Sequence, residues 1–280
     1  PQHFRMDLRD APLMRLVCAY DRSQQRWAAL LMFHHMLFDH VAMDLLQYEL
    51  QAFLAGEEAR LSAAVPYRNY VAQARLGMTE QEHEAFFGAM LADIDEPTLP
   101  FGLHTVQAGG TLELARLPVE EGLGQRLRSA ARQLGVSAAS LMHVAWAQVL
   151  AHVCGQDDVV FGTVLMGGMQ GGERALGLFI NTLPLRVDVG EQGIRAGVRA
   201  THARLTTLLD HEHASLALAQ RCSGVAAAMP LFSALVNYRH STPDEMARAG
   251  KGIGHGVPVL GGEERRNEQR TLSVDDVGTG

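Results

Sequence analysis

Long hydrophobic runs are missing from this chain of 280 residues, in which 47% of residues are hydrophobic and 20% are charged. A membrane-spanning helix needs about 20 apolar residues in succession, whereas the longest candidate, Ala28 to Phe33, has only the length of a strand. The N-terminus lacks the apolar core of a signal peptide. Basic residues are also in deficit, since 24 Lys and Arg against 31 Asp and Glu give a net charge of −7. The sequence therefore predicts no membrane segment and argues against nucleic acid as a partner.

Cysteine is scarce as well. Cys18, Cys154 and Cys222 are far apart, odd in number and set in apolar surroundings. They predict buried thiols in a reducing, cytoplasmic compartment and not a disulfide framework or a zinc site. The chain begins without Met and stops just after a strand-like run, so we expect a fragment of a longer polypeptide. Its length suits one large domain or two lobes.

The hydrophobic periodicity indicates a mixed α/β fold. The strand-like run at residues 27–33 is continuously apolar, which predicts burial on both faces. The stretch 93–110 is the best candidate for a linker, and the His-Glu-His sequence at 211–213 is expected to end a helix as a polar cap. We expect strands near residues 12–20, 27–33, 111–117, 159–164, 178–189, 231–238 and 269–274, and helices near 41–54, 67–76, 80–91, 120–134, 137–152 and 194–211.

The most informative segment is residues 34–40 (HHMLFDH), which places three imidazoles and a carboxylate at the end of a buried strand. Burying such groups costs several kcal/mol unless they are satisfied, so a functional role is favoured over a set of core histidines. Adjacent strand residues point to opposite faces, so His34 and His35 should do different work. A metal site of the H-x-H-x-D-H type does not fit this spacing, and no HExxH or CxxC sequence supplies further ligands. A histidine base with a structural aspartate fits best.

Residues 34–40 resemble the HHxxxDG motif of nonribosomal peptide synthetase condensation domains and their acyltransferase relatives. Residues 4–15 (FRMDLRDAPLMR) are similar to the FDLxxGPLxR segment of that family, and residues 65–73 (VPYRNYVAQ) to its YxDYAxWQ helix. Residues 135–163, ending in GQDDVVFGT, are similar to its GVTL…SGQDDxxxGxP stretch. Residues 177–186 (GLFINTLPLR) resemble GxFVNTLxLR, and residues 230–238 (PLFSALVNY) resemble PLFQVxFxxQN. The order and spacing of these segments agree across essentially the whole chain.

The resemblance implies an α/β sandwich of two chloramphenicol acetyltransferase-like lobes in a V-shaped pseudo-dimer, with the first lobe incomplete. Residues 1–100 would form the partial N-terminal lobe with its linking helices, and residues 101–280 most of the C-terminal lobe. The implied reaction is amide formation between a donor acyl or peptidyl thioester and the amine of an acceptor aminoacyl thioester. Both substrates ride on phosphopantetheine arms of peptidyl carrier proteins, so no cofactor is bound directly. An adenylation domain in the same polypeptide is an implied neighbour.

The resemblance also assigns site residues. His35, the second motif histidine, would face the substrate tunnel as the base or positioner of the amine, since an imidazole can accept a proton near neutral pH. His34 would be structural, and Asp39 would form a structural ion pair. His40 replaces the usual glycine of the motif and would line the substrate tunnel, as would Asn181, for which capping a turn is an equal alternative. No metal is implied.

Other members of the superfamily remain as alternatives. They are an epimerisation domain, which shares HHxxxDG, a coenzyme A-dependent O-acyltransferase, and a degenerate docking domain without activity. The segments 181–183 and 231–238 favour condensation over epimerisation.

Overall fold

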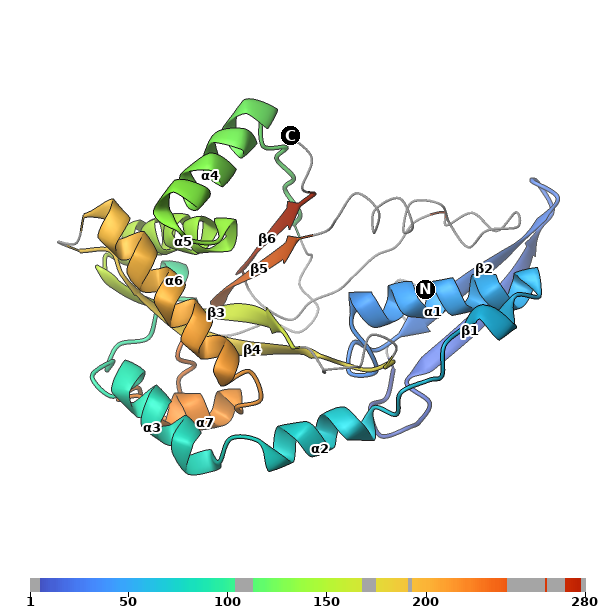
Figure 1. Cartoon of the computed structure of the whole chain (residues 1–280), viewed down its shortest axis with the longest axis horizontal. Helices are drawn as coiled ribbons and strands as arrows, with labels where there is room; N and C mark the ends of the chain where they lie inside the picture. Colours follow the sequence, from blue (N-terminus) through green and yellow to red (C-terminus); the bar gives the residue numbers. More distant parts are fainter. Residues whose placement is uncertain are drawn as a thin grey trace. The chain divides into compact units, whose positions relative to one another are not determined.

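The contacts within the chain divide it into two units, each of which is described by itself (Figure 1). This computed structural model describes residues 6–103, 113–167, 175–190, 193–240, 260 and 270–277. The described part of the smaller unit comprises residues 6–71 and 175–180, and the remaining described residues form the larger unit. The expected lobes, 1–100 and 101–280, stay a prediction.

The smaller unit contains an antiparallel hairpin of β1 (Met14–Asp21) and β2 (Arg26–Phe33), followed by α1 (His40–Ala55) and the 3₁₀ turn η1 (Glu58–Arg60). Helix α2 (Arg68–Leu76) begins at the end of this unit. The two strands, α1 and α2 follow the predicted ranges closely, whereas η1 was not predicted. Gly56 ends α1 in the left-handed conformation, φ 68°, where a residue without Cβ is favoured.

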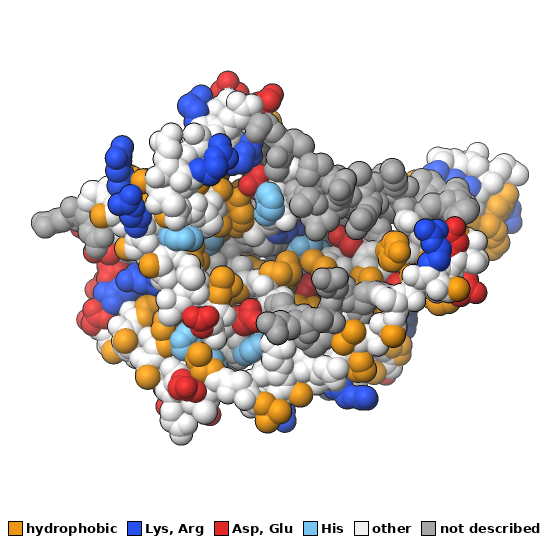
Figure 2. All heavy atoms as spheres, in the orientation of Figure 1, with side chains coloured by type: hydrophobic (Ala, Val, Ile, Leu, Met, Phe, Trp, Pro, Cys, Tyr) orange, Lys and Arg blue, Asp and Glu red, His pale blue; other side chains and the backbone are white. Residues whose placement is uncertain are grey.

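The hairpin is more exposed than the sequence predicted. Leu16 and Trp27 are 62% and 72% exposed, and hydrophobic side chains lie on the hairpin surface at the right of Figure 2. The expectation that β2 is buried on both faces was wrong, because β1 is the only strand that pairs with it among the described residues. Cys18, on β1, is also exposed, whereas Cys154 and Cys222 are half-buried.

The larger unit is built on a four-stranded sheet in the order β4-β3-β5-β6. The strands are β3 (Asp158–Met166), β4 (Ile180–Asp188), β5 (Ala234–His240) and β6 (Arg270–Asp276); β3 pairs with β5, and β5 with β6, in parallel. Its helices are α3 (Glu80–Leu91), η2 (Pro100–Gly102), α4 (Glu121–Leu134), α5 (Ala138–Cys154), α6 (Ile194–Asp210) and α7 (Leu216–Arg221). The mixed α/β prediction is therefore confirmed.

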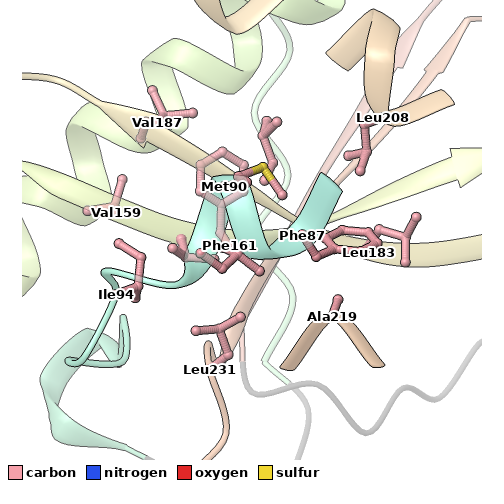
Figure 3. Packing of buried hydrophobic residues seen from close by; sticks show 14 of the residues in the cluster. Phe87, Met90, Ile94, Val159, Phe161, Leu183, Val187, Leu208, Ala219 and Leu231 are labelled. Carbon is pink, nitrogen blue, oxygen red and sulfur yellow. The ribbon is translucent and has the colours of Figure 1, made fainter. Parts of the chain in front are cut away.

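The core of the larger unit lies against β3, where Val159, Val160 and Phe161 are all at most 1% exposed. Successive strand residues point to opposite faces, so burial of all three means that both faces of β3 are covered. Figure 3 shows Phe87 and Met90 from α3 packed with residues of the sheet and of α6 and α7. The strand expected near residues 159–164 is therefore confirmed, as part of β3.

Helix ends follow local sequence signals. Thr79 and Glu82 form a reciprocal capping box at the start of α3, and the Ser137 hydroxyl accepts the Ser140 amide at the start of α5. Gly135, φ 68°, ends α4 in the left-handed conformation. Such caps satisfy amide and carbonyl groups that a helix end leaves unpaired.

The proposed linker is only partly a linker. Ile94 and Thr98 are 8% and 1% exposed, and the Thr98 hydroxyl accepts a hydrogen bond from the Val160 amide at 2.9 Å. Arg186 on β4 donates to Asp93 at 2.6 Å. Residues 93–102 therefore pack onto the larger unit, so the linker prediction was wrong there, while residues 104–110 lie outside the described part.

Two further predictions differ from the structure. Residues 113–117 are irregular and exposed, so the strand expected at 111–117 is absent from its described part, while α7 was not predicted.

Candidate functional site

The histidine motif begins where β2 ends, at Phe33. The His34 amide donates to the Leu13 carbonyl at 2.9 Å and closes the hairpin, and the Leu37 amide donates to the His34 carbonyl at 3.0 Å. Nδ1 of His34 accepts the Met36 amide at 3.1 Å. An Nδ1 that accepts a hydrogen bond carries no proton, which leaves the ring proton on Nε2. The half-buried His34 ring is thus fixed by its own turn, which suits a structural role.

His35 follows in the same turn, and its side chain is exposed. The two adjacent histidines therefore differ in burial, although the strand has already ended before them. An exposed imidazole on a turn that is held by hydrogen bonds can contact a second molecule and exchange a proton with it. The assignment of His35 as the base or positioner stays a prediction.

Asp39 is the most buried polar group of the motif, at 1% exposure. Its Oδ1 accepts the Ala42 amide at 3.0 Å and caps α1, while its Oδ2 accepts the Phe179 amide at 2.9 Å. A carboxylate that accepts amide hydrogens at a helix N-terminus also interacts favourably with the helix dipole. These contacts give Asp39 two backbone partners that sequence reasoning missed, and its expected structural ion pair stays a prediction.

His40, where the family motif has glycine, is the first residue of α1. Among the described residues other than glycine, only Gln25 and Phe101 have positive φ. The backbone at His40 therefore has no need of glycine, and the exposed imidazole stands at the helix start without backbone strain. Its place in a substrate tunnel remains a prediction.

Asn181 belongs to β4 and, in the division by contacts, to the larger unit. Its side-chain amide donates to the Glu212 carbonyl at 2.7 Å and to the Ala214 carbonyl at 2.8 Å, and its Oδ1 accepts the Thr182 amide at 2.9 Å. The side chain thereby holds the turn that follows α6. A role for Asn181 beside substrate stays a prediction.

Neither a metal-binding cluster nor a single membrane-spanning helix occurs in the described residues. They contain no group of three or more His, Cys, Asp or Glu side chains placed to hold a metal ion. None of their helices alone is long and apolar enough to cross a membrane; α4 and α5 would meet that test only together, across a bend of 106°.

Comparison with known proteins places these motifs in a family. The family model described as the condensation domain matches residues 2–255. Malpinin synthetase from Mortierella alpina is 49% identical over 283 residues, covering 100% of this chain and 4% of the relative. A linear gramicidin synthase polypeptide from Brevibacillus parabrevis is 28% identical, over 85% of this chain and 3% of the relative. The chain thus spans only a few per cent of the length of these synthetases.

Solved structures share the fold. The condensation domain of the monacolin K polyketide synthase MokA superimposes with a TM-score of 0.68 at 15% identity, covering 96% of this chain and 65% of that one. The starter condensation domain of the rhizomide synthetase RzmA gives a TM-score of 0.61 at 21% identity, over 83% of this chain and 54% of that one. The sequence match covers most of the chain, and the fold is shared. Both agree with the HHxxxDG-like motif at residues 34–40, which we call the histidine turn. This chain belongs to the condensation domain family.

Proposed function

We propose that this chain catalyses amide formation between two carrier-bound thioesters within a nonribosomal peptide synthetase. The observation that carries the proposal is the exposed His35 on a turn that is anchored by the buried Asp39, in a chain of the condensation domain family. The names of the relatives, among them malpinin synthetase and linear gramicidin synthase, support a peptide-forming reaction.

The reaction removes one proton from the acceptor amine and adds one proton to the released thiol. The acceptor amine attacks the donor thioester carbonyl, so a C–N bond forms and the C–S bond breaks. His35 takes or orients the proton that the amine loses, and this proton finally resides on the released thiol. Because both reactants are tethered, alignment supplies much of the rate enhancement, and general base catalysis by a positioned imidazole contributes typically 10²–10⁴-fold.

The remaining motif residues take supporting roles in this proposal. His34 and Asp39 hold the turn, and His40 and Asn181 line the path of the substrate. The partners are the donor and acceptor carrier proteins, whose phosphopantetheine arms bring in the substrates, and an adenylation domain of the same polypeptide. A solved four-domain nonribosomal peptide synthetase that resembles this chain in fold supports such neighbours. We place the reaction in the cytoplasm.

The test is a single turnover in the intact parent polypeptide. Donor and acceptor are loaded on their carriers, and the mass of the acceptor carrier is followed with time. We expect a gain equal to the donor acyl group, with a rate constant that falls by about 10²-fold or more in His35→Ala. The matched control is His152→Ala, since His152 is an exposed histidine on α5.

Two outcomes would contradict the proposal. If the acceptor gains no mass with any of several donor–acceptor pairs, the condensation activity is refuted. Exchange of an α-hydrogen for deuterium from the solvent would then point to epimerisation. If mass is gained equally in wild type and His35→Ala, the role of His35 is refuted while the activity stands.

A further inference from the structure

Residues Gly177–Phe179 are held against Asp39 by two hydrogen bonds. The Asp39 amide donates to the Gly177 carbonyl at 3.3 Å, and the Phe179 amide donates to Oδ2 of Asp39 at 2.9 Å. The described parts of both segments belong to the smaller unit. Asp39 is four residues from His35, and it also caps α1. The position of the histidine turn is therefore tied to the position of this three-residue segment.

Tyr67 holds the same segment through its hydroxyl and its ring. The hydroxyl donates to the Leu178 carbonyl at 2.5 Å, and the ring meets Phe179 edge to face at a centroid distance of 5.4 Å. Burial raises the pKa of the Tyr67 hydroxyl, and the charge of Asp39 raises it further. The hydroxyl thus remains a hydrogen-bond donor at neutral pH.

The segment Gly177–Phe179 comes closest to the Tyr67 ring at Gly177. A Cβ at this position would lie 2.0 Å from Cδ2 and 2.2 Å from Cε2 of the Tyr67 ring. Such distances are far inside van der Waals contact, so any side chain at 177 would displace either the ring or the segment. The packing of the ring onto the backbone explains the glycine without any special φ.

Tyr67 is itself fixed by its place in the chain. Its carbonyl accepts the Val71 amide at 3.2 Å at the start of α2, and Tyr70 from the same helix packs its ring edge to face on Phe179 at 4.7 Å. The backbone position of Tyr67 is therefore fixed by the start of α2.

We propose that Tyr67 is a positioning residue for His35, acting through Gly177–Phe179 and Asp39. Tyr67 touches neither substrate nor the reacting atoms in this scheme; it sets where the turn presents the imidazole. Reaction rates are sensitive to small displacements of a catalytic group. This inference rests on the proposed condensation function.

The experiment uses the same single-turnover transfer in the intact parent polypeptide. Molecules in which the domain is unfolded do not react and lower the amplitude, whereas misplacement of His35 lowers the rate constant of the molecules that do react. In Tyr67→Phe, which keeps the ring and removes the hydroxyl, we expect the rate constant to fall about tenfold, the effect of one lost hydrogen bond, with the amplitude unchanged. The matched control, Tyr48→Phe, changes an exposed tyrosine of α1 and should keep the wild-type rate constant.

A double-variant comparison tests the contact directly. Gly177→Ala should slow transfer by about 10²-fold, because its Cβ pushes against the Tyr67 ring. Tyr67→Ala removes that ring, so adding Gly177→Ala to Tyr67→Ala should slow transfer no further. Independent effects would instead multiply.

The outcomes separate this inference from the function on which it rests. If His35→Ala slows transfer but Tyr67→Phe keeps the wild-type rate constant, the positioning role is overturned and the function stands. Multiplying effects in the double variant would also overturn it. No transfer in the wild type would overturn both.

Discussion

Acidification below about pH 6.5 should destabilise the larger unit, because two imidazole rings meet inside it. Nδ1 of His83 lies 2.9 Å from Nδ1 of His211, and the two residues are 6% and 7% exposed. The His211 ring also stacks on Phe86 at a centroid distance of 4.0 Å. A hydrogen bond between two ring nitrogens needs one donor and one acceptor. The pair can therefore hold one extra proton, but a second would place two N–H groups and two charges face to face.

The direction of the effect follows from the pKa shifts, and its size follows from the unfolded-state pKa and from how many of the two rings stay neutral in the folded state. Burial lowers the pKa of both rings. The charge of His83 lowers the pKa of His211 further, and that of His213 lowers the pKa of His83. The charge of Glu82 opposes the shift in both rings, and Asp210 opposes it in His211. Because the folded-state pKa lies below the unfolded value of about 6.5, the unfolded chain binds more protons in acid. Stability is full above this unfolded value and falls as the pH decreases. Each ring that stays neutral in the folded state costs about 1.4 kcal/mol at pH 5.5, so the pair should cost between about 1.4 and 2.8 kcal/mol.

Urea unfolding at pH 7.5 and pH 5.5 measures this loss. Fluorescence of Trp146 on α5 reports on the larger unit when Trp27, the second tryptophan, is replaced by Phe. In His83→Asn, which keeps a short polar partner for His211, the loss of unfolding free energy between the two pH values should shrink by about 1 kcal/mol. The exposed His152→Asn should leave the loss unchanged. An equal loss in His83→Asn and the parent chain would refute the reasoning.

Two further changes test the packing of the larger unit by urea unfolding. Gly162→Ala should lower the unfolding free energy by about 1–3 kcal/mol, since its Cβ would lie 2.7 Å from the Phe232 ring, whereas Gly197→Ala on α6 meets open space and should stabilise slightly. Ser137→Ala should cost about 1 kcal/mol, because α5 loses the hydroxyl that accepts the Ser140 amide; a loss below about 0.3 kcal/mol would mean that this cap contributes little.

The sequence predicted the local elements well because their signals are local. Helix α3 was expected at residues 80–91 and spans Glu80–Leu91. The helices expected at 120–134 and 137–152 span Glu121–Leu134 and Ala138–Cys154, with Gly135 and Ser137 as caps. A capping hydroxyl or a left-handed glycine acts on residues within one turn of itself, so no knowledge of the rest of the chain is needed to infer it.

Burial and pairing depend on distant residues, and there the sequence was a weaker guide. The 211–213 segment does end a helix, but His211 is buried against His83, which lies 128 positions away in the sequence. Residues 113–117 alternate like a strand yet pair with no described strand. Alternation shows which face would be apolar, but only a neighbouring strand supplies the hydrogen bonds.

The candidate site combines both kinds of information. Resemblance to a family selected the residues, but it did not show which atoms hold them. The sequence argument separated His34 from His35 because strand neighbours point to opposite faces. In the structure β2 has already ended at Phe33, and the separation arises because the turn uses the His34 ring as an acceptor for its own backbone. The different roles expected of the two imidazoles therefore depend on the turn and its anchor at Asp39, so changes that loosen this anchor should impair His35 even where every motif residue is retained.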